Sequence, residues 1–177
     1  MRPIIVAIVG ASGSGKTFLS KYLRDQFDVP LIVSSTTRPI REDEIEGEDY
    51  YFVSDTKGVD RSAMLTHTCF GKHEYYSLKS QLPSDGLCSY VVDENGIKAL
   101  KESAGAEYGV CSVYVQCRPE TLVDRGIAPE RIERDRNRKQ IDYSMIDLVI
   151  NNNGTLDDFK TNIDHLIQII RQWQPLL

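Results

Sequence analysis

Residues 10–17 read GASGSGKT and combine closely spaced glycines with a lysine and a hydroxyl side chain. The stretch fits the pattern G-x-x-x-x-G-K-[ST], whose glycines let backbone N–H groups turn inward around phosphate oxygens. Lys16 can reach the β- and γ-phosphates of a nucleoside triphosphate, and the Thr17 hydroxyl can bind Mg²⁺. The pattern therefore predicts a donor-nucleotide site formed by Gly10, Ala11, Ser12, Gly13, Ser14, Gly15, Lys16 and Thr17.

This pattern alone leaves open a GTPase, an ATPase or a kinase, and it also leaves open a chance match on a flexible loop. The guanine-reading sequence N-K-x-D, which GTPases normally carry, does not occur in the chain, and 177 residues are few for a large motor ATPase. A small kinase is therefore favoured. Such an enzyme needs a second anion site that faces the first.

Arg38, Arg41 and Glu44 follow one another at intervals of three residues in a downstream loop. Forked guanidinium groups bind a phosphate through two contacts at once, and a neighbouring carboxylate can fix their direction. The alternative is a solvated surface loop of mixed charge, which is the usual structure of such runs. The phosphate loop upstream favours a second phosphate pocket.

The elements that must position these groups can be read from the apolar pattern. Residues 4–9 form a continuous apolar run, typical of a strand buried on both faces, and apolar residues then recur at helical spacing after the loop. Further elements are expected at 31–33, 89–93, 110–117 and 146–150 as strands and at 156–170 as a helix. This alternation predicts an α/β fold with a doubly wound, mainly parallel five-stranded sheet, the core of a P-loop kinase.

Two segments interrupt the alternation. Residues from about 35 to 85 mix polar residues with short aromatic patches and predict a small inserted mixed β subdomain that binds the acceptor. Residues from about 125 to 139 are helical in pattern but rich in charge, and the family resemblance described below implies that they form a short helical lid. We expect a single kinase domain over residues 1–177, with its core at about 1–34, 86–124 and 140–177.

Composition and charge narrow the function further. The net charge of −5 argues against a general binder of nucleic acid or anionic membranes. The apolar run at the N-terminus is too short for export or for spanning a bilayer, so a cytoplasmic protein is expected. The cysteines and histidines lack metal-ligand spacing, which favours buried reduced thiols over a disulfide or a zinc site; the cysteines are Cys69, Cys88, Cys111 and Cys117.

The loop around the two arginines also resembles a known family. Residues 34–53 read SSTTRPIREDEIEGEDYYFV and resemble the acceptor-site motif S-x-T-T-R-x-x-R-x-x-E-x-x-G-x-D-Y-x-F-V of the guanylate kinase family, without a gap. By this resemblance Arg38, Arg41 and Tyr50 hold the phosphate of GMP. It also implies that Glu44 orients the arginines and that Ser35 lies near the base.

Two further stretches are similar to the family more weakly. GKHEYYS at 71–77 is similar to G-N-x-Y-G-[ST], which places Tyr75 or Tyr76 on the acceptor phosphate and Ser77 near the base. SYVVDENG at 89–96 is similar to I-L-D-I-D-x-Q-G, which places Asp93 beside Mg²⁺ waters or the acceptor. The alternatives are aromatic packing for the tyrosines and a helix N-cap for Asp93.

The chain also departs from the family in its base-reading positions. Val91 replaces the first aspartate of the I-L-D-I-D-x-Q-G pattern. The glutamate with which the family grips the guanine edge falls here among Thr66, His67 and Thr68, and Glu74 is out of register. Guanine recognition is therefore less well specified by the sequence than phosphate binding.

The charged segment resembles the family's lid, whose arginines cover the transferred phosphoryl group, but it is shorter. Arg125 with Gly126 resembles the R-G of that lid, and Arg131 or Arg134 its later arginine. The alternative is a solvated helix with i,i+4 ion pairs. Asn151 matches a family position near the donor adenine, and the alternative there is a turn.

The resemblance identifies the chain as a divergent, short-lidded member of the guanylate kinase family. It implies ATP-dependent phosphorylation of a nucleoside monophosphate, most simply GMP or dGMP in purine nucleotide metabolism, by a monomer or homodimer. Lys16, Arg41, Arg125, Arg131 and Arg134 are the expected catalytic residues, and Thr17 and Asp93 would face Mg²⁺. The alternatives are a kinase for a different small phosphate or nucleotide, and a noncatalytic interaction module of the same fold.

Overall fold

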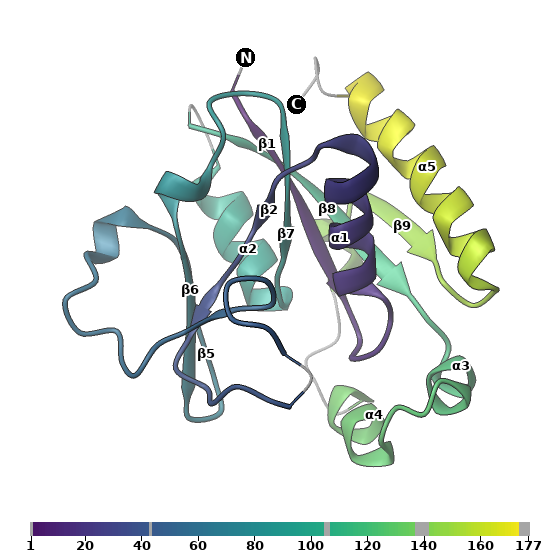
Figure 1. Cartoon of the computed structure of the whole chain (residues 1–177). Coiled ribbons are helices and arrows are strands. Elements are labelled where there is room, and N and C mark those ends of the chain that lie inside the picture. Colours follow the sequence, from purple (N-terminus) through teal and green to yellow (C-terminus); the bar gives the residue numbers. More distant parts are fainter. Residues whose placement is uncertain (1, 43, 105–106, 137–141, 174–177) are drawn as a thin grey trace.

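The structure is a computed structural model that describes residues 2–42, 44–104, 107–136 and 142–173. Its centre is a parallel five-stranded sheet in the order β2-β7-β1-β8-β9 (Figure 1). The strands are β1 (Ile4–Gly10), β2 (Leu31–Ile32), β7 (Leu87–Val91), β8 (Gly109–Gln116) and β9 (Leu148–Asn151). The predicted doubly wound α/β fold is confirmed, with strand ends shifted by one or two residues from those expected.

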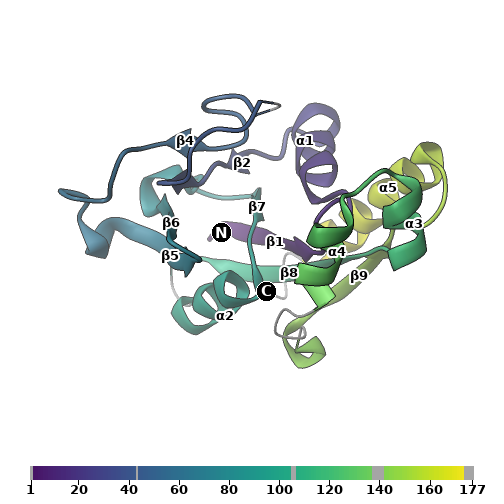
Figure 2. The ribbon, with the colours of Figure 1, turned by 90° about the horizontal axis from the view of Figure 1, so that it is seen from below.

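Helices cover both faces of this sheet. Helices α1 (Lys16–Phe27) and α5 (Leu156–Trp173) lie on one face, and α2 (Glu94–Ser103) lies on the other, as Figures 1 and 2 both show. The side chains of β1 alternate between two apolar clusters. Ile4, Val6 and Ile8 pack with α1 and α5, whereas Ile5, Ala7 and Val9 pack with α2. Because β1 is buried on both faces, its carboxyl end is a rigid support for the phosphate loop.

A second, mixed sheet of four strands forms the inserted region. Its order is β4-β3-β6-β5, with β3 and β4 parallel and the other pairs antiparallel. The strands are β3 (Ser35–Thr36), β4 (Tyr51–Phe52), β5 (Met64–Phe70) and β6 (His73–Leu78). The long β5–β6 hairpin stands beside the β2 edge of the central sheet (Figure 1). The predicted mixed β insertion is thus present.

Short helices complete the described chain. Helices α3 (Pro119–Asp124) and α4 (Pro129–Arg136) follow β8 and lie near the start of α1 (Figure 2). Three 3₁₀ helices join other segments: η1 (Arg61–Ala63), η2 (Lys79–Gln81) and η3 (Tyr143–Met145). The predicted lid segment is therefore helical at 129–136, while its last residues, 137–139, lie outside the described residues. No helix in the described ranges is both long and apolar enough to cross a membrane.

The cysteines correct one expectation. All four are free, but only Cys88 and Cys111 are buried, and burial raises the pKa of each thiol to about 12. Cys69 is exposed and Cys117 is half-buried. These two lie near the ends of β5 and β8, where a strand leaves the cover of its helices, so the prediction of four buried thiols was wrong for them.

Candidate active site

The phosphate loop joins β1 to α1, and its glycines are required by its shape. Gly13 and Gly15 have φ values of +76° and +104°, which side chains rarely tolerate. A Cβ at Gly13 would lie 2.4 Å from the Ile127 side chain, and one at Gly15 would lie 2.5 Å from Asn152. Gly15 caps α1 without a side-chain hydrogen bond. The first N–H groups of α1 therefore lack a side-chain cap at the helix end that favours negative charge.

Lys16 is folded back onto its own loop. Its Nζ donates hydrogen bonds to the carbonyl oxygens of Gly10 at 2.8 Å and Ala11 at 2.7 Å. Thr17, the next residue, is exposed to the same cavity. The loop therefore holds its ammonium group at the predicted phosphate loop, and Thr17 beside it lines the same cavity.

A buried amide fixes the loop from the opposite side. Nδ2 of Asn152 donates to the Ser14 carbonyl at 2.8 Å, and Arg125 Nη2 donates to Asn152 Oδ1 at 3.0 Å. Asn151, which the family resemblance places near the donor adenine, is exposed. Its side-chain oxygen accepts a hydrogen bond from the N–H of Asn153. Arg125 contacts the loop only through Asn152. The sequence did not point to Asn152, whose contact with the loop is seen only because this residue is buried just after β9.

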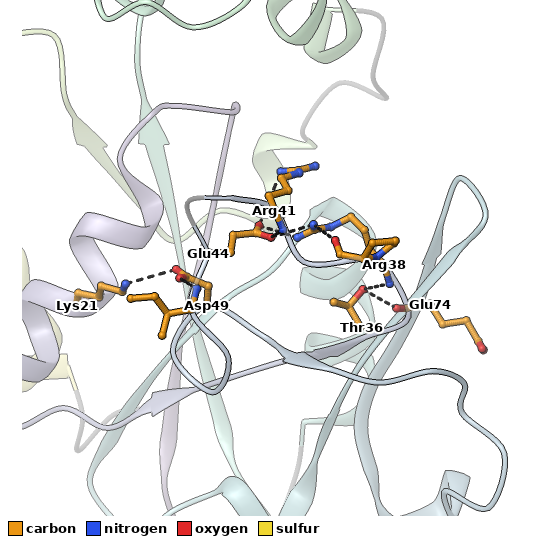
Figure 3. Close-up of polar contacts among 9 residues, drawn as sticks. Lys21, Thr36, Arg38, Arg41, Glu44, Asp49 and Glu74 are labelled. Atoms are coloured by element: carbon orange, nitrogen blue, oxygen red, sulfur yellow. Dashed lines mark hydrogen bonds and ion pairs between the residues drawn. The ribbon is translucent and has the colours of Figure 1, made fainter.

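The predicted arginine pair meets Glu44 in the structure, as Figure 3 shows. Arg38 forms a two-point contact with Glu44, Nη2 to Oε1 at 2.7 Å and Nη1 to Oε2 at 2.9 Å. The backbone N–H of Arg41 donates to the same carboxylate at 2.9 Å. The Arg38 side chain is 10% exposed, whereas that of Arg41 is 54% exposed. Arg38 is therefore a largely buried part of the site, whereas the Arg41 side chain is accessible to a ligand.

The ionisation of this pair follows from its contacts. Burial opposes the charged form of Glu44, but the hydrogen bonds from Arg38 and from the Arg41 N–H outweigh it and lower the pKa of the carboxyl. Burial likewise opposes the charge of Arg38, and Glu44 outweighs it and raises the pKa of the guanidinium. Both groups are consequently charged at neutral pH. The site keeps a fixed guanidinium and a fixed carboxylate where the acceptor phosphate is predicted.

Aromatic rings support Arg38 from β6 and the loop before β4. Its guanidinium carbon lies 5.3 Å from the centre of the Tyr50 ring, and that ring lies 5.9 Å from the ring of Tyr75. Tyr75 lines the same cavity as Arg38, while Tyr76 is buried on the other face of β6. The structure thus separates the two tyrosines that the sequence left undecided, because successive strand residues point to opposite faces.

One cavity of about 620 Å³ is lined by both the phosphate loop and the inserted region. Its lining includes Ser12, Gly13, Gly15, Lys16 and Thr17 of the phosphate loop, Arg38, Arg41, Glu44, Tyr50 and Tyr75 of the inserted region, Asp93, and Arg131 and Arg134 of α4. Arg125 is outside this lining. The phosphate loop and the inserted region with its two arginines, which are distant in the sequence, therefore open into one space.

The far end of the cavity is lined by hydroxyl groups. Thr66 Oγ1 lies 2.7 Å from the Tyr90 hydroxyl and 3.1 Å from Ser77 Oγ, and the Tyr90 hydroxyl lies 3.0 Å from Ser34 Oγ. Ser34 lines the cavity, whereas Ser35 lies within β3, paired with Tyr51 and Tyr76. The predicted Ser77 takes part through its contact with Thr66. The sequence left Thr66 undecided among Thr66, His67 and Thr68, and it gave no role to Tyr90. The alternation of β5 shows that Thr66 faces inward, and the contact with Tyr90 joins β5 to β7.

Helix α4 contacts both sides of the cavity. Arg134 Nη2 donates to Ser12 Oγ at 2.8 Å, and its guanidinium carbon lies 5.8 Å from the Phe70 ring at the end of β5. The Ser12 backbone N–H donates to the Asp135 carboxylate. Burial of Asp135 would raise its pKa, but the contacts from Ser12 and Arg134 outweigh burial and lower it. A carboxylate of the predicted lid therefore takes one N–H donor of the phosphate loop.

The structure shows the N-cap role of Asp93 and also places this residue in the cavity lining. As the N-cap of α2, its Oδ1 accepts the Gly96 N–H at 2.7 Å. Thr17 and Asp93 offer only oxygen ligands, which suit a hard cation such as Mg²⁺. The residues present thus fit the predicted metal ion.

Comparisons with known proteins agree with this geometry. The model of the guanylate kinase family matches residues 1–172. A guanylate kinase of Hyphomonas neptunium is 31% identical over 187 residues, covering 96% of this chain and 83% of that protein. One from Chlamydia trachomatis is 28% identical over 156 residues, covering 82% and 74%. The crystal structure of the guanylate kinase from Anaplasma phagocytophilum has the same fold, with a TM-score of 0.62 and 22% identity over 96% of this chain and 86% of that one.

Proposed function

The chain belongs to the guanylate kinase family, and we propose that it transfers the γ-phosphoryl group of ATP to a nucleoside monophosphate, with GMP or dGMP as the acceptor. The observation that carries the proposal is the single cavity shared by Lys16 and the Arg38–Arg41 pair. A phosphoryl donor and a phosphate acceptor need this arrangement, because the reaction joins two anions that repel each other in water. The insertion at about 35–85 would carry the acceptor and the core would carry ATP.

The residues suggest a direct transfer without a covalent intermediate. Lys16 and the first N–H groups of α1 hold the donor phosphates, while Arg38, Arg41, Tyr50 and Tyr75 hold the acceptor phosphate in line with them. Arg131 and Arg134 of α4 neutralise the charge that spreads over the transferred group. Arg125 acts on the phosphate loop through Asn152 and is a positioning residue in this proposal.

Thr17 and Asp93 would hold Mg²⁺ or its water ligands at the end of β1 and β7. When bound, Mg²⁺ neutralises charge on the phosphates and orients them. Asp93 is well placed for this role because its carboxylate is already fixed by the first turn of α2. Closure of α4 over the cavity would exclude water, which otherwise competes as an acceptor.

The decisive experiment follows ADP release with ATP and Mg²⁺ over a panel of acceptors. We expect GMP and dGMP to be phosphorylated at least about tenfold more efficiently than AMP, CMP or UMP, with the diphosphate confirmed by mass spectrometry. ATP turnover with none of the monophosphates contradicts the proposed kinase activity. Preference for a different monophosphate contradicts only the guanine assignment.

The hydroxyl-lined end of the cavity favours one second candidate, a kinase for a different small phosphate or nucleotide. The Watson–Crick edge of guanine presents two adjacent donors, N1–H and the 2-amino group, for which an acceptor-only carboxylate is the best partner. Thr66, Tyr90 and Ser34 are neutral and can donate or accept. A base without the 2-amino group would then be accepted nearly as well.

GMP and IMP separate these candidates because they differ only in the 2-amino group. Efficiencies within about threefold favour the second candidate, and a preference for GMP of about 30-fold or more favours guanine recognition. Thr66→Glu tests the position directly, since a carboxylate there should raise the GMP-to-IMP ratio. Thr66→Gln, which has the same length without the negative charge, is the matched control.

A further inference from the structure

The outer face of the β5–β6 hairpin carries three metal-ligating side chains that play no part in the proposed reaction. His67 and Cys69 are two residues apart on β5 and therefore share a face, and Cys69 pairs directly with Glu74 on β6. Thr66, Thr68 and Tyr75 point from the opposite face into the nucleotide cavity. We name His67, Cys69 and Glu74 the hairpin cluster.

The geometry points to a binding site for a single Zn²⁺-like divalent transition-metal ion at the hairpin cluster. One imidazole nitrogen, one thiol sulfur and one carboxylate oxygen all lie within 4.8 Å of one another. Tetrahedral Zn²⁺, with bonds of about 2.0–2.3 Å, needs ligand atoms about 3.3–3.8 Å apart. The exposed Cys69 side chain can make the remaining adjustment by rotating, and water can fill the fourth position.

A neighbouring residue already orients one of the ligands, and that ligand in turn contacts a second. Thr56 Oγ1 donates to Glu74 Oε2 at 2.8 Å, which leaves Oε1 directed at His67 Nε2, 2.9 Å away. In Figure 3 the Glu74 side chain extends away from Arg38 and Arg41. Outer hydrogen bonds of this kind fix ligand orientation in metal sites. The carboxylate therefore belongs to the hairpin cluster and not to the acceptor site.

The ligand set also selects the metal. A mixture of thiolate, imidazole and carboxylate suits Zn²⁺ and Co²⁺, whereas Mg²⁺ prefers oxygen ligands alone. Binding releases the thiol proton to solvent and moves the imidazole proton from Nε2 to Nδ1. The site is separate in chemistry and position from the Mg²⁺ expected with ATP, and it does not depend on the proposed activity.

Arg61 is the residue that competes with the metal. Its Nη1 lies 3.4 Å from His67 Nδ1, and its Nη2 lies 3.9 Å from Glu74 Oε1. A guanidinium has no acceptor for the Nδ1 proton and repels a cation. Arg61 is 68% exposed and can withdraw. Arg61→Gln should bind metal more tightly, because the glutamine amide oxygen can accept the Nδ1 proton and carries no charge.

Titration of the reduced, metal-free full chain with Co²⁺ tests the site. We expect a thiolate-to-cobalt charge-transfer band and visible absorption of a four-coordinate ion, saturating at one Co²⁺ per chain and displaced by Zn²⁺ but not by excess Mg²⁺. Cys69→Ser should abolish the charge-transfer band, and Cys117→Ser, at the other accessible thiol, should retain it. His67→Gln and Glu74→Gln should weaken binding at least about tenfold.

Two outcomes overturn the site: no thiolate band in the unaltered chain, or a band that survives in Cys69→Ser. Thermal unfolding of each variant without metal separates loss of the ligand from loss of the fold, and all three side chains are accessible enough for folding to persist. Affinity of Arg61→Gln at or below that of the unaltered chain overturns the role given to Arg61. None of these readouts requires kinase activity.

Discussion

The two ends of the cavity are built in different ways. The phosphate loop is held by backbone geometry, with glycines at positive φ and a carbonyl held by buried Asn152. The acceptor region is held by side chains, above all the Arg38–Glu44 pair and the rings around it. A site built from backbone carries a strict sequence pattern, whereas a site built from side chains depends on which face of a strand each residue occupies.

Lys16→Ala should have the largest effect, because it removes the only lysine of the phosphate loop. We expect turnover to fall about 10³-fold, as for the loss of a group that stabilises transition-state charge. Stability should change little, since the Nζ contacts are to carbonyl groups that water can satisfy. Steady-state kinetics and thermal unfolding measure both effects.

Lys98→Ala, an exposed position on α2, is the matched control for Lys16→Ala. Its turnover should equal that of the unaltered chain. Turnover of Lys16→Ala within about tenfold of the control would contradict the role proposed for Lys16 at the phosphates of ATP.

Arg41→Met should lower turnover about 10²-fold with little change in the free energy of unfolding, because this side chain is mostly exposed. Arg38→Met should lower activity and also destabilise the fold by about 2 kcal/mol, since it removes the two-point contact of the Glu44 carboxylate and leaves only the more distant and more exposed Arg41 guanidinium, 3.9 Å away. Denaturant unfolding of both variants checks the difference. Equal losses of stability in the two variants would contradict the assignment of a structural role to Arg38 and a ligand-binding role to Arg41.

Asp135→Ala tests the donor end from the lid. Its carboxylate takes the Ser12 N–H that a phosphate oxygen could use, so removal should tighten ATP binding about 3- to 10-fold, as expected for about 1 kcal/mol. Calorimetric titration with ATP and Mg²⁺ measures this. Asp124→Ala, an exposed change on α3, is the control, and weaker ATP binding by Asp135→Ala would assign the carboxylate a supporting role instead.

The smallest effect is a pH dependence at the acceptor end. The lowered pKa of Glu44 means that its charged form stabilises the fold fully above the ordinary value of 4.5 and loses this contribution as pH falls through the lowered pKa. The unaltered chain should therefore exceed Glu44→Gln in stability at pH 7, and the gap should shrink below about pH 4.5. A gap that stays constant down to pH 3 contradicts the ion pair.

Particular residues show how far sequence reasoning reaches. The phosphate loop, the strand before it and the Arg38–Glu44 contact could be predicted, because each depends on residues close together in the chain. The choice of Tyr75 over Tyr76, of Asn152 over Asn151 and of Ser34 over Ser35 could not. Each choice turns on a shift of one residue, which reverses the direction of a side chain and is fixed only by pairing and packing.

The sequence by itself determined the chemistry of the donor loop, because backbone conformation there is encoded by glycines, and it determined the family, which fixes the layered α/β fold. Tertiary structure decided which side chains lie next to one another. It placed Thr66 beside Tyr90 in the cavity, Asp135 on the phosphate loop, and His67, Cys69 and Glu74 together on the outer face of the hairpin. The physical reason is that strand pairing joins residues distant in the chain and assigns every second one to the opposite face.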